Sequence, residues 1–163
     1  MKGRSNYLCL HRFETWRDGV SVDTSAVGRL IDSGDRVLLP ILDQWARRTD
    51  TGDRAELRDL PEDHPLWKDI SADAETCLGQ ECPRWNDCFV TQMRQRAADS
   101  DVVIVNHHLL CADASVRQGA FGEVIPDCDF LIVDEAHQLE DVVTHYFGVA
   151  LTAHRLEIGR AHV

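Results

Sequence analysis

The sequence predicts an α/β fold, in which strands of a parallel sheet accompany a smaller helical part that holds four of the six cysteines. Two short runs rich in β-branched residues, Val102-Val103-Ile104-Val105 and Phe130-Leu131-Ile132-Val133, are bounded by polar residues. Uninterrupted apolar runs of this length are typical of strands covered on both faces, as in a parallel sheet. Because parallel strands need a crossover connection, we expect a helix over residues 108–117 between them.

A second helix is expected soon after the run that ends at Val133. Apolar residues recur there with the period of one helical face: Leu139, Val142, Val143, Tyr146 and Phe147. Gly148 is expected to end this helix. The segment Asp134-Glu135-Ala136-His137 therefore falls at the turn between strand and helix, where open α/β sheets place ligands.

The first part of the chain is predicted to contain helices around an irregular loop. Apolar spacings of three and four residues predict two helices between residues 25 and 48. Ser33-Gly34-Asp35 is expected to form the break between them, and Pro40 to kink the second helix. Turn-forming residues predict a loop over residues 50–65.

One more helix is predicted to end at Ala98, with Asn86 or Asp87 as its cap. The change from this helix to the strand-like runs lies near residue 100. We therefore divide the chain into a first domain over residues 1–98 and a second domain over residues 99–156.

Composition excludes several classes of protein. With 44% hydrophobic residues, the chain can form a core and is neither disordered nor fibrous. No apolar run approaches the ~20 residues of a membrane span, and no apolar signal-peptide region follows Met1. We expect a soluble, cytoplasmic protein with no membrane partner. Its cysteines are then expected to be reduced thiols or metal ligands, not disulfides.

Charge is unevenly distributed along the chain. The net charge of −11 disfavours binding to nucleic acid, because phosphate neutralisation requires an excess of Lys and Arg. Residues 1–17 and 84–96, however, both carry such an excess. These two basic stretches flank the cysteines.

Four cysteines form the candidate ligand set: Cys9, Cys77, Cys82 and Cys88. The last three lie on a short loop, and Cys9 has to reach them from far upstream. Four thiolates suit either a [4Fe-4S] cluster or a tetrahedral Zn²⁺, and the spacing leaves both open, although zinc sites more often use two close pairs. Cys111 and Cys128 are predicted to be buried thiols without a ligand role.

The acidic turn is the second candidate site. An aspartate at the carboxyl end of a strand can hold Mg²⁺ through water, and the next carboxylate can activate the attacking water during phosphoryl transfer. We assign Asp134 to Mg²⁺ and Glu135 to the water, and expect His137 to sense the γ-phosphate. The alternative is that this acidic pair merely caps a helix.

Six stretches, covering residues 2 to about 155, resemble the DinG/XPD-type iron-sulfur DNA helicases of superfamily 2, and the DinG and YoaA branch in particular. They are Lys2-Gly3-Arg4-Ser5-Asn6-Tyr7-Leu8-Cys9, Thr51-Gly52-Asp53-Arg54-Ala55-Glu56-Leu57, Cys77-Leu78-Gly79-Gln80-Glu81-Cys82-Pro83, Asp87-Cys88-Phe89, Val105-Asn106-His107-His108-Leu109-Leu110 and Ile132-Val133-Asp134-Glu135-Ala136-His137.

This resemblance implies a fragment of the first motor domain, with a partial RecA-like parallel sheet and an inserted small helical iron-sulfur domain. It implies that the four cysteines ligate a [4Fe-4S] cluster and that residues 134–137 form the DEAH box, which binds Mg²⁺ and ATP. Such helicases move 5′ to 3′ along single-stranded DNA, open junctions with duplex DNA, and act in DNA repair and replication. His107 and His108 match a family stretch that we interpret as structural.

Basic and aromatic residues near the cysteines are candidate DNA contacts: Arg4, Arg84, Trp85 and Arg94. Arg4 could alternatively support the cluster. An aromatic side chain beside basic groups is also ordinary packing.

The sequence departs from the family in one respect, because it contains no Gly-x-x-x-x-Gly-Lys-Ser/Thr phosphate loop. We therefore expect that this polypeptide does not hydrolyse ATP or unwind DNA alone. Residues 157–163 resemble the translation of a sequencing adapter, and we expect them to be a non-native tail. The alternative to a helicase fragment is a stand-alone metal-binding module, either an iron-sulfur electron carrier or a zinc adaptor.

Overall fold

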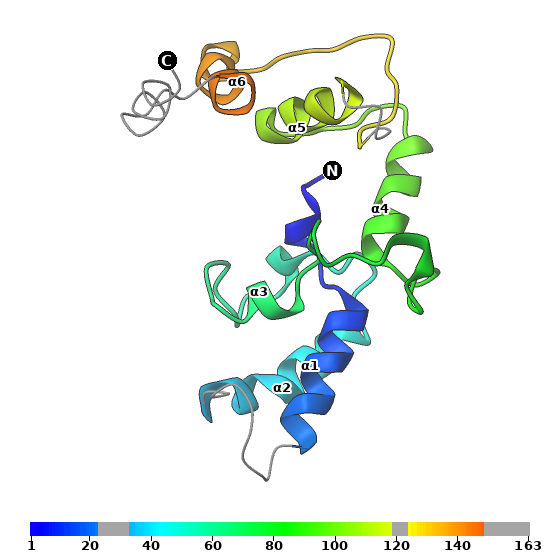
Figure 1. Cartoon of the computed structure of the whole chain (residues 1–163), viewed down its shortest axis with the longest axis vertical. Coiled ribbons are helices and arrows are strands. Elements are labelled where there is room, and N and C mark those ends of the chain that lie inside the picture. The colour runs from blue at the N-terminus through cyan, green and yellow to red at the C-terminus, as the bar shows by residue number, and fades with distance from the viewer. Residues whose placement is uncertain (23–32, 119–123, 149–163) are drawn as a thin grey trace, which may run out of the picture. The chain divides into compact units, whose positions relative to one another are not determined.

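The computed structural model describes residues 1–22, 33–118 and 124–148 of the chain (Figure 1). The chain divides into two units, Met1–Ile104 and Val105–Val163, close to the predicted division after residue 98. The non-native tail expected over residues 157–163 lies outside the described residues, as does most of the helix expected from residue 25. None of the helices within the described ranges is long and apolar enough to cross a membrane.

Helices dominate the first unit. Its elements are the 3-10 turn η1 (Arg4–Asn6), α1 (Leu10–Val22), α2 (Ser33–Ala46), η2 (Arg54–Glu56), α3 (Trp67–Ile70), η3 (Gly79–Glu81) and α4 (Phe89–Ala98). The second helix expected before residue 48 is present as α2, with Pro40 inside it. The predicted break at Ser33-Gly34-Asp35 is wrong, because these residues already belong to α2. The predicted loop after residue 50 is confirmed except for η2 and the turns that lead to α3.

The cysteine-proximal helix α4 ends at Ala98, as predicted. Its expected caps, Asn86 and Asp87, are wrong. Cys88 occupies the N-cap position with an extended backbone, and no side chain caps this helix. Sequence patterning also missed α1, because few apolar residues mark a helical face there, and Phe13 is its deeply buried residue.

The core of the first unit joins the N-terminal segment to α1, α2, α3 and α4. Its most deeply buried large side chains are Leu8, Leu42, Leu66 and Ile70. Trp45 and Trp67 meet edge to face, with ring centroids 6.0 Å apart. This arrangement is favourable because the ring edge carries positive and the ring face negative charge.

The N-terminal segment passes between two other pieces of chain. The N–H of Leu8 donates to the carbonyl of Gly52 at 2.8 Å, and the N–H of Cys9 donates to the carbonyl of Ile70 at 2.8 Å. The N–H of Ala72 donates in turn to the carbonyl of Tyr7 at 2.9 Å. These bonds form two isolated antiparallel bridges. They bring the region before Cys9 beside the region that leads to Cys77.

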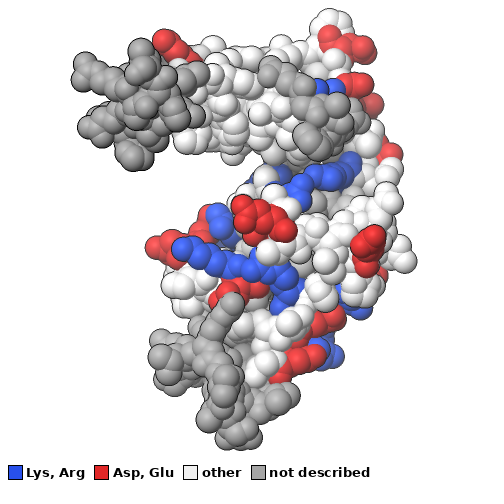
Figure 2. Space-filling model, in the orientation of Figure 1, with Lys and Arg blue, Asp and Glu red and all other residues white. Residues whose placement is uncertain are grey.

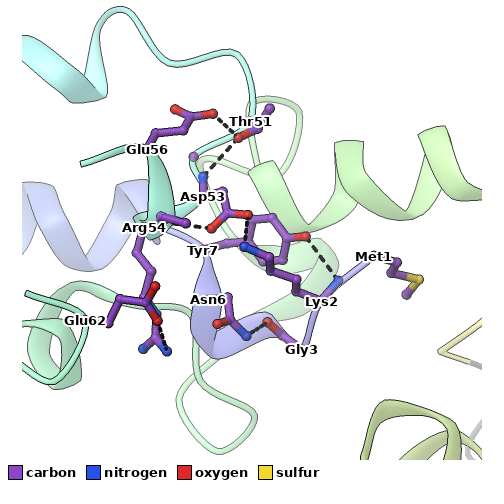
Figure 3. A network of polar contacts seen from close by, with 12 residues as sticks. Met1, Lys2, Gly3, Asn6, Tyr7, Thr51, Asp53, Arg54, Glu56 and Glu62 are labelled. Atoms are coloured by element: carbon purple, nitrogen blue, oxygen red, sulfur yellow. Dashed lines mark hydrogen bonds and ion pairs between the residues drawn. The ribbon is translucent and has the colours of Figure 1, made fainter. Parts of the chain in front are cut away.

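Side chains reinforce this arrangement (Figure 3). Lys2 forms an ion pair of 2.6 Å with Asp53, and the backbone N–H of Lys2 donates to the hydroxyl of the buried Tyr7 at 3.3 Å. Burial raises the pKa of Tyr7, so that its hydroxyl stays neutral. The segment before Cys9 is therefore fixed by both main-chain and side-chain contacts.

The second unit contains α5 (His107–Gln118), the short turn η4 (Ala136–Gln138) and α6 (Leu139–Phe147). The predicted helix over residues 108–117 is confirmed as α5. The predicted helix after residue 138 is confirmed as α6, and Gly148 is its C-cap. The two helices pack together, and the rings of His108 and Tyr146 lie 6.2 Å apart.

The buried carboxylate of Asp113 holds the backbone at Val124 and Ile125. Asp113 is 6% exposed and accepts the N–H groups of Val124 at 2.6 Å and Ile125 at 2.9 Å. Arg117 donates to Asp113 at 2.7 Å and to the carbonyl of Ile125 at 2.6 Å. Burial opposes the charge of Asp113, but these donors outweigh it and lower its pKa.

The two runs predicted as strands, residues 102–105 and 130–133, are not paired into a sheet in the part of the chain that the structure describes. Their side chains are largely exposed, at 80% for Ile104 and 94% for Ile132. A strand depends on hydrogen bonds to a neighbour, and these runs lack one among the described residues. The partial RecA-like sheet therefore stays a prediction.

Candidate metal centre and acidic turn

The four predicted ligand cysteines lie at the ends of elements in the first unit. Cys9 precedes α1, and its carbonyl accepts the N–H of Phe13 at 2.9 Å, so it stands at the start of that helix. Cys77 lies just before η3, Cys82 directly follows it, and Cys88 is the N-cap of α4. Helix ends give the four side chains defined backbone anchors.

The three later cysteines are carried on a series of tight turns. The N–H of Cys82 donates to the carbonyl of Gly79 at 3.1 Å, and the N–H of Cys88 to that of Trp85 at 3.3 Å. Gly79 has a φ of 59°, a conformation that glycine adopts without strain. The loop thus turns back on itself between Cys77 and Cys88.

Contacts between α1 and the cysteine-bearing segment bring Cys9 near the loop: Arg84 lies 3.6 Å from Glu14, and Arg12 donates to the hydroxyl of Thr76 at 3.3 Å. Burial raises the pKa of the Cys9 thiol, and the nearby Cys82 and Cys88 act in the same direction. Cys77 and Cys88 both influence the guanidinium of Arg94. All four cysteines are free thiols. The sequence-remote Cys9 is therefore brought to the loop that carries the other three.

The donor set fits a group that takes four thiolates, such as a [4Fe-4S] cluster. All four are free thiols at the ends of α1, η3 and α4. Among the described residues, no three His, Cys, Asp or Glu side chains are arranged as the ligands of a metal ion. In the described part of the chain, the thiols are thus not closed into such a site.

Arg12 is a residue that sequence reasoning did not single out. It donates to the carbonyl of Ser71 at 3.0 Å, to the carbonyl of Lys68 at 2.5 Å and to the hydroxyl of Thr76 at 3.3 Å. Arg12 therefore ties α1, which starts beside Cys9, to the segment that ends at Cys77. The only sequence signal for this role was the excess of basic residues in the first 17 positions.

The predicted DNA contacts differ in their surroundings. Arg84 forms ion pairs with Glu14 at 3.6 Å and with Asp87 at 3.5 Å, so part of its charge is balanced within the protein. Trp85 and Arg4 are half-buried. Figure 2 shows basic side chains grouped on one face of the first unit, with acidic ones interspersed.

The acidic turn lies in the second unit and is exposed to solvent. Asp134, Glu135 and His137 are all exposed. The Oδ1 of Asp134 accepts the N–H of Glu135 at 2.9 Å, and the Nδ1 of His137 lies 3.3 Å from Oε2 of Glu135. Glu135 has a φ of 48°, a left-handed conformation that is uncommon for a residue other than glycine.

His107 connects α5 to this turn. Its Nε2 lies 3.0 Å from the backbone carbonyl of Asp134. The sequence interpretation of His107 as a structural residue agrees with this contact. Of the other cysteines, Cys111 is buried, as predicted, whereas the prediction for Cys128 is wrong. Cys128 lies in the exposed stretch before residue 130, where no packed strand covers it among the described residues.

Known proteins were found to match along almost the whole chain, although no protein-family model and no solved structure matches it. The chain is 41% identical over 156 residues to the ATP-dependent DNA helicase YoaA of Haemophilus influenzae. It is 36% identical over 169 residues to the ATP-dependent helicase DinG of Mycobacterium tuberculosis. The chain belongs to the DinG and YoaA family.

This DinG/YoaA-type chain spans only part of its relatives. The match to YoaA covers 96% of the chain and 23% of that protein, and the match to DinG covers 94% and 23%. A third relative is the 3′-5′ exonuclease DinG of Bacillus subtilis, at 31% identity over 153 residues, or 93% of the chain and 15% of the relative. The family expected from the sequence motifs is confirmed.

Proposed function

We propose that this chain forms the cysteine-bearing domain and the acidic turn of an ATP-dependent DNA helicase. The observation that carries the proposal is the 41% identity to a protein named ATP-dependent DNA helicase YoaA, over 96% of the chain. Both candidate sites fall within a match of that extent. The partners that we propose are ATP, single-stranded DNA and junctions of single-stranded with duplex DNA.

The acidic turn is proposed to act on the nucleotide. Asp134 is the residue that would hold a hydrated Mg²⁺, and Glu135 the one that would take a proton from the attacking water. The exposed carboxylates and the contact between Glu135 and His137 support these roles. His107 supports them indirectly, because its contact with the Asp134 carbonyl fixes the backbone of the turn.

The four cysteines are proposed to hold a [4Fe-4S] cluster, which would supply a rigid cross-link and a redox-active centre. Support comes from the four free thiols and from the contacts of Arg12 with Thr76 and of Arg84 with Glu14, which join α1 to the cysteine-bearing segment. The chain itself contributes the contacts that keep Cys9 beside the loop. These are the main-chain bridges at Leu8 and the hydrogen bonds of Arg12.

Movement along DNA from 5′ to 3′ and activity in DNA repair and replication complete the proposal. Arg4, Arg84, Arg94 and Trp85 are the residues that would contact a single strand, with Trp85 stacking on a base and the arginines near phosphates. Arg84 is a weaker candidate than Arg4 because Glu14 and Asp87 already pair with it.

A chimera tests the role of the acidic turn. Residues 1–156 of this chain would replace the matching segment of Haemophilus influenzae YoaA, because the sequence itself has no phosphate loop. We expect DNA-stimulated ATP hydrolysis from the chimera. Glu135→Gln should abolish turnover and leave nucleotide binding intact, while Glu140→Gln, at the start of α6, should change neither. Unchanged turnover in the Glu135→Gln chimera would refute the assigned role.

Anaerobic reconstitution tests the metal centre separately. The full chain would be purified without oxygen, loaded with iron and sulfide, and analysed for both elements and for visible absorption. We expect iron and acid-labile sulfide in equal amounts, and their loss in Cys82→Ser. Cys111→Ser, at a buried thiol of the second unit, is the matched control. One zinc ion per chain without sulfide would instead support the zinc-adaptor alternative.

A further inference from the structure

The peptide group that joins Asp134 to Glu135 in the acidic turn is held at both of its ends. Its N–H, which belongs to Glu135, donates to Oδ1 of Asp134 at 2.9 Å. Its carbonyl oxygen, which belongs to Asp134, lies 3.0 Å from Nε2 of His107. Because a carbonyl oxygen only accepts hydrogen bonds, this Nε2 carries the hydrogen. The peptide is planar, so these two bonds fix its orientation between the two carboxylates assigned to the nucleotide.

The backbone next to this peptide is in a conformation that needs support. Glu135 has a φ of 48°, which is unfavourable for a residue with a side chain and persists only where the surrounding contacts enforce it. Two contacts of the turn are local: the carbonyl of Glu135 accepts the N–H of Gln138 at 2.9 Å, and Nδ1 of His137 lies 3.3 Å from Oε2 of Glu135. The contact with His107 spans 27 positions of sequence and ties the turn to a different element, α5.

The start of α5 holds His107 in place. His107 is the first residue of this helix and is half-buried. Asn106 precedes it and caps the helix, because its Oδ1 accepts the N–H of Leu109 at 2.8 Å and its carbonyl accepts the N–H of Leu110 at 3.1 Å. Leu109 is buried. The imidazole that meets the acidic turn therefore projects from a capped and packed helix end.

We propose that His107 is a positioning residue for ATP turnover: its Nε2–H holds the Asp134 carbonyl and thereby the directions in which the side chains of Asp134 and Glu135 project. Asn106 assists by fixing the helix end that carries the imidazole. The proposal rests on the nucleotide role proposed for the acidic turn. It gives His107 a part in the rate of the reaction, beyond the structural role expected from the sequence.

Two substitutions separate the hydrogen bond of His107 from the bulk of its ring. His107→Leu removes the donor and keeps a side chain of similar size. His107→Gln keeps an N–H donor at about the reach of Nε2. His108→Leu is the matched control, because His108 is the next residue of α5 and its ring lies near Tyr146 instead of the turn. Circular dichroism would confirm that each variant keeps its helices.

Hydrogen exchange tests the contact in the full chain. The amide of Glu135 is bonded to Oδ1 of Asp134 only while the peptide keeps its orientation, so its exchange, measured by NMR, reports that orientation. We expect His107→Leu to speed this exchange roughly 10-fold, the scale of one hydrogen bond. His107→Gln should restore part of the protection, and His108→Leu should match the wild type.

The YoaA chimera tests the consequence for turnover. Misplacing a reacting group slows the chemical step more than it weakens binding. We therefore expect His107→Leu to lower kcat roughly 10-fold, the scale typical of groups that hold metal ligands in place, with the KM for ATP nearly unchanged. His107→Gln should recover part of kcat, and His108→Leu should leave both constants as they are.

These measurements separate the role of His107 from the function on which it rests. Unchanged exchange at Glu135 in His107→Leu, or exchange raised equally in His108→Leu, overturns the role of the contact in the chain itself. Unchanged kcat for His107→Leu, in a chimera that Glu135→Gln inactivates, overturns the role of His107 in turnover and leaves the proposed function standing. If Glu135→Gln does not reduce turnover, the proposed function fails, and the role of His107 in turnover fails with it.

Discussion

Gly52 packs directly against the ring of Phe89. A β-carbon at position 52 would lie 2.3 Å from Cδ2 of that ring, well inside van der Waals contact. The backbone of Gly52 is left-handed, with a φ of 65°, and its carbonyl accepts the N–H of Leu8. Because Phe89 follows Cys88 and opens α4, this glycine sets how closely the loop before η2 approaches the cysteine loop.

Gly52→Ala should therefore destabilise the first unit by about 3 kcal/mol, the sum of overpacking and left-handed strain. Chemical denaturation followed by circular dichroism measures the change. Gly79→Ala separates the two causes, since Gly79 is also left-handed but a β-carbon there would meet no other atom within 4 Å. We expect about 1 kcal/mol for that variant. Equal effects at both positions would contradict the steric argument.

Glu56 is predicted to make stability depend on pH. Burial opposes its charge, but hydrogen bonds from Thr49, Thr51 and Trp45 outweigh burial, and the pKa lies below the ordinary value of 4.5. The stability that the charged Glu56 adds to the fold is therefore fully present above pH 4.5. It is lost as the pH falls through the lowered pKa of this carboxyl. Glu56→Gln should cost about 1 kcal/mol near neutral pH, because the site is partly exposed.

The measurement for Glu56 is the free energy of unfolding between about pH 7 and about pH 3. The difference between wild type and Glu56→Gln should shrink toward the acidic end. Glu62→Gln is the control, since Glu62 is exposed and its contact with Arg54 is 3.5 Å long. A constant difference across the range would show that the charge of Glu56 is not involved.

Among the polar side chains of the second unit, Asp113 should contribute most to its stability. Replacing it with alanine leaves two N–H groups, those of Val124 and Ile125, without this acceptor. We expect a loss of about 2 to 3 kcal/mol. Hydrogen exchange at these two amides would report it directly. Asp127→Ala removes an exposed ion pair of Arg117 and should leave the protection of the Val124 and Ile125 amides nearly unchanged. An equal loss of protection in Asp127→Ala would show that Asp113 is not the main contributor.

The left-handed backbone of Glu135 is predicted to lower the stability of the chain. Glu135→Gly should be more stable than Glu135→Ala by about 1 kcal/mol, because glycine adopts a positive φ without a steric penalty. At Glu140, within α6, the order should be reversed by a similar amount, since glycine disfavours a helix. Comparing the four variants by thermal unfolding tests both signs. The same order at both positions would exclude backbone strain at Glu135.

Local patterns predicted the helices that carry an apolar face. The periodicity after residue 138 indicated α6 and its end at Gly148. The helix α5 was instead expected as the crossover between two strands, which are not paired in the described part of the chain. Sequence reasoning missed α1, because its face is marked by few apolar side chains. It also missed Arg12, whose partners lie more than fifty positions away and become neighbours only through the fold.

The candidate site residues were chosen from local sequence patterns, whereas their structural surroundings could not be predicted. The cysteine spacing and the acidic turn are local features of sequence. The left-handed backbone of Glu135 and the contact of His107 with Asp134 depend on tertiary structure. The apolar runs before Asn106 and before Asp134 were predicted as strands from local pattern alone. A strand also requires a hydrogen-bonded neighbour, which a local pattern cannot supply.

The bridges that hold the N-terminal segment also determine when, during folding, Cys9 reaches its native position. Leu8 and Cys9 are bonded to Gly52 and Ile70, so distant parts of the chain must meet before Cys9 is delivered. Such long-range closure is a late and entropically costly event in folding. Under the proposed [4Fe-4S] assignment, Cys9 would join the other three cysteines only in the completed fold. Insertion of the cluster would then depend on correct tertiary structure.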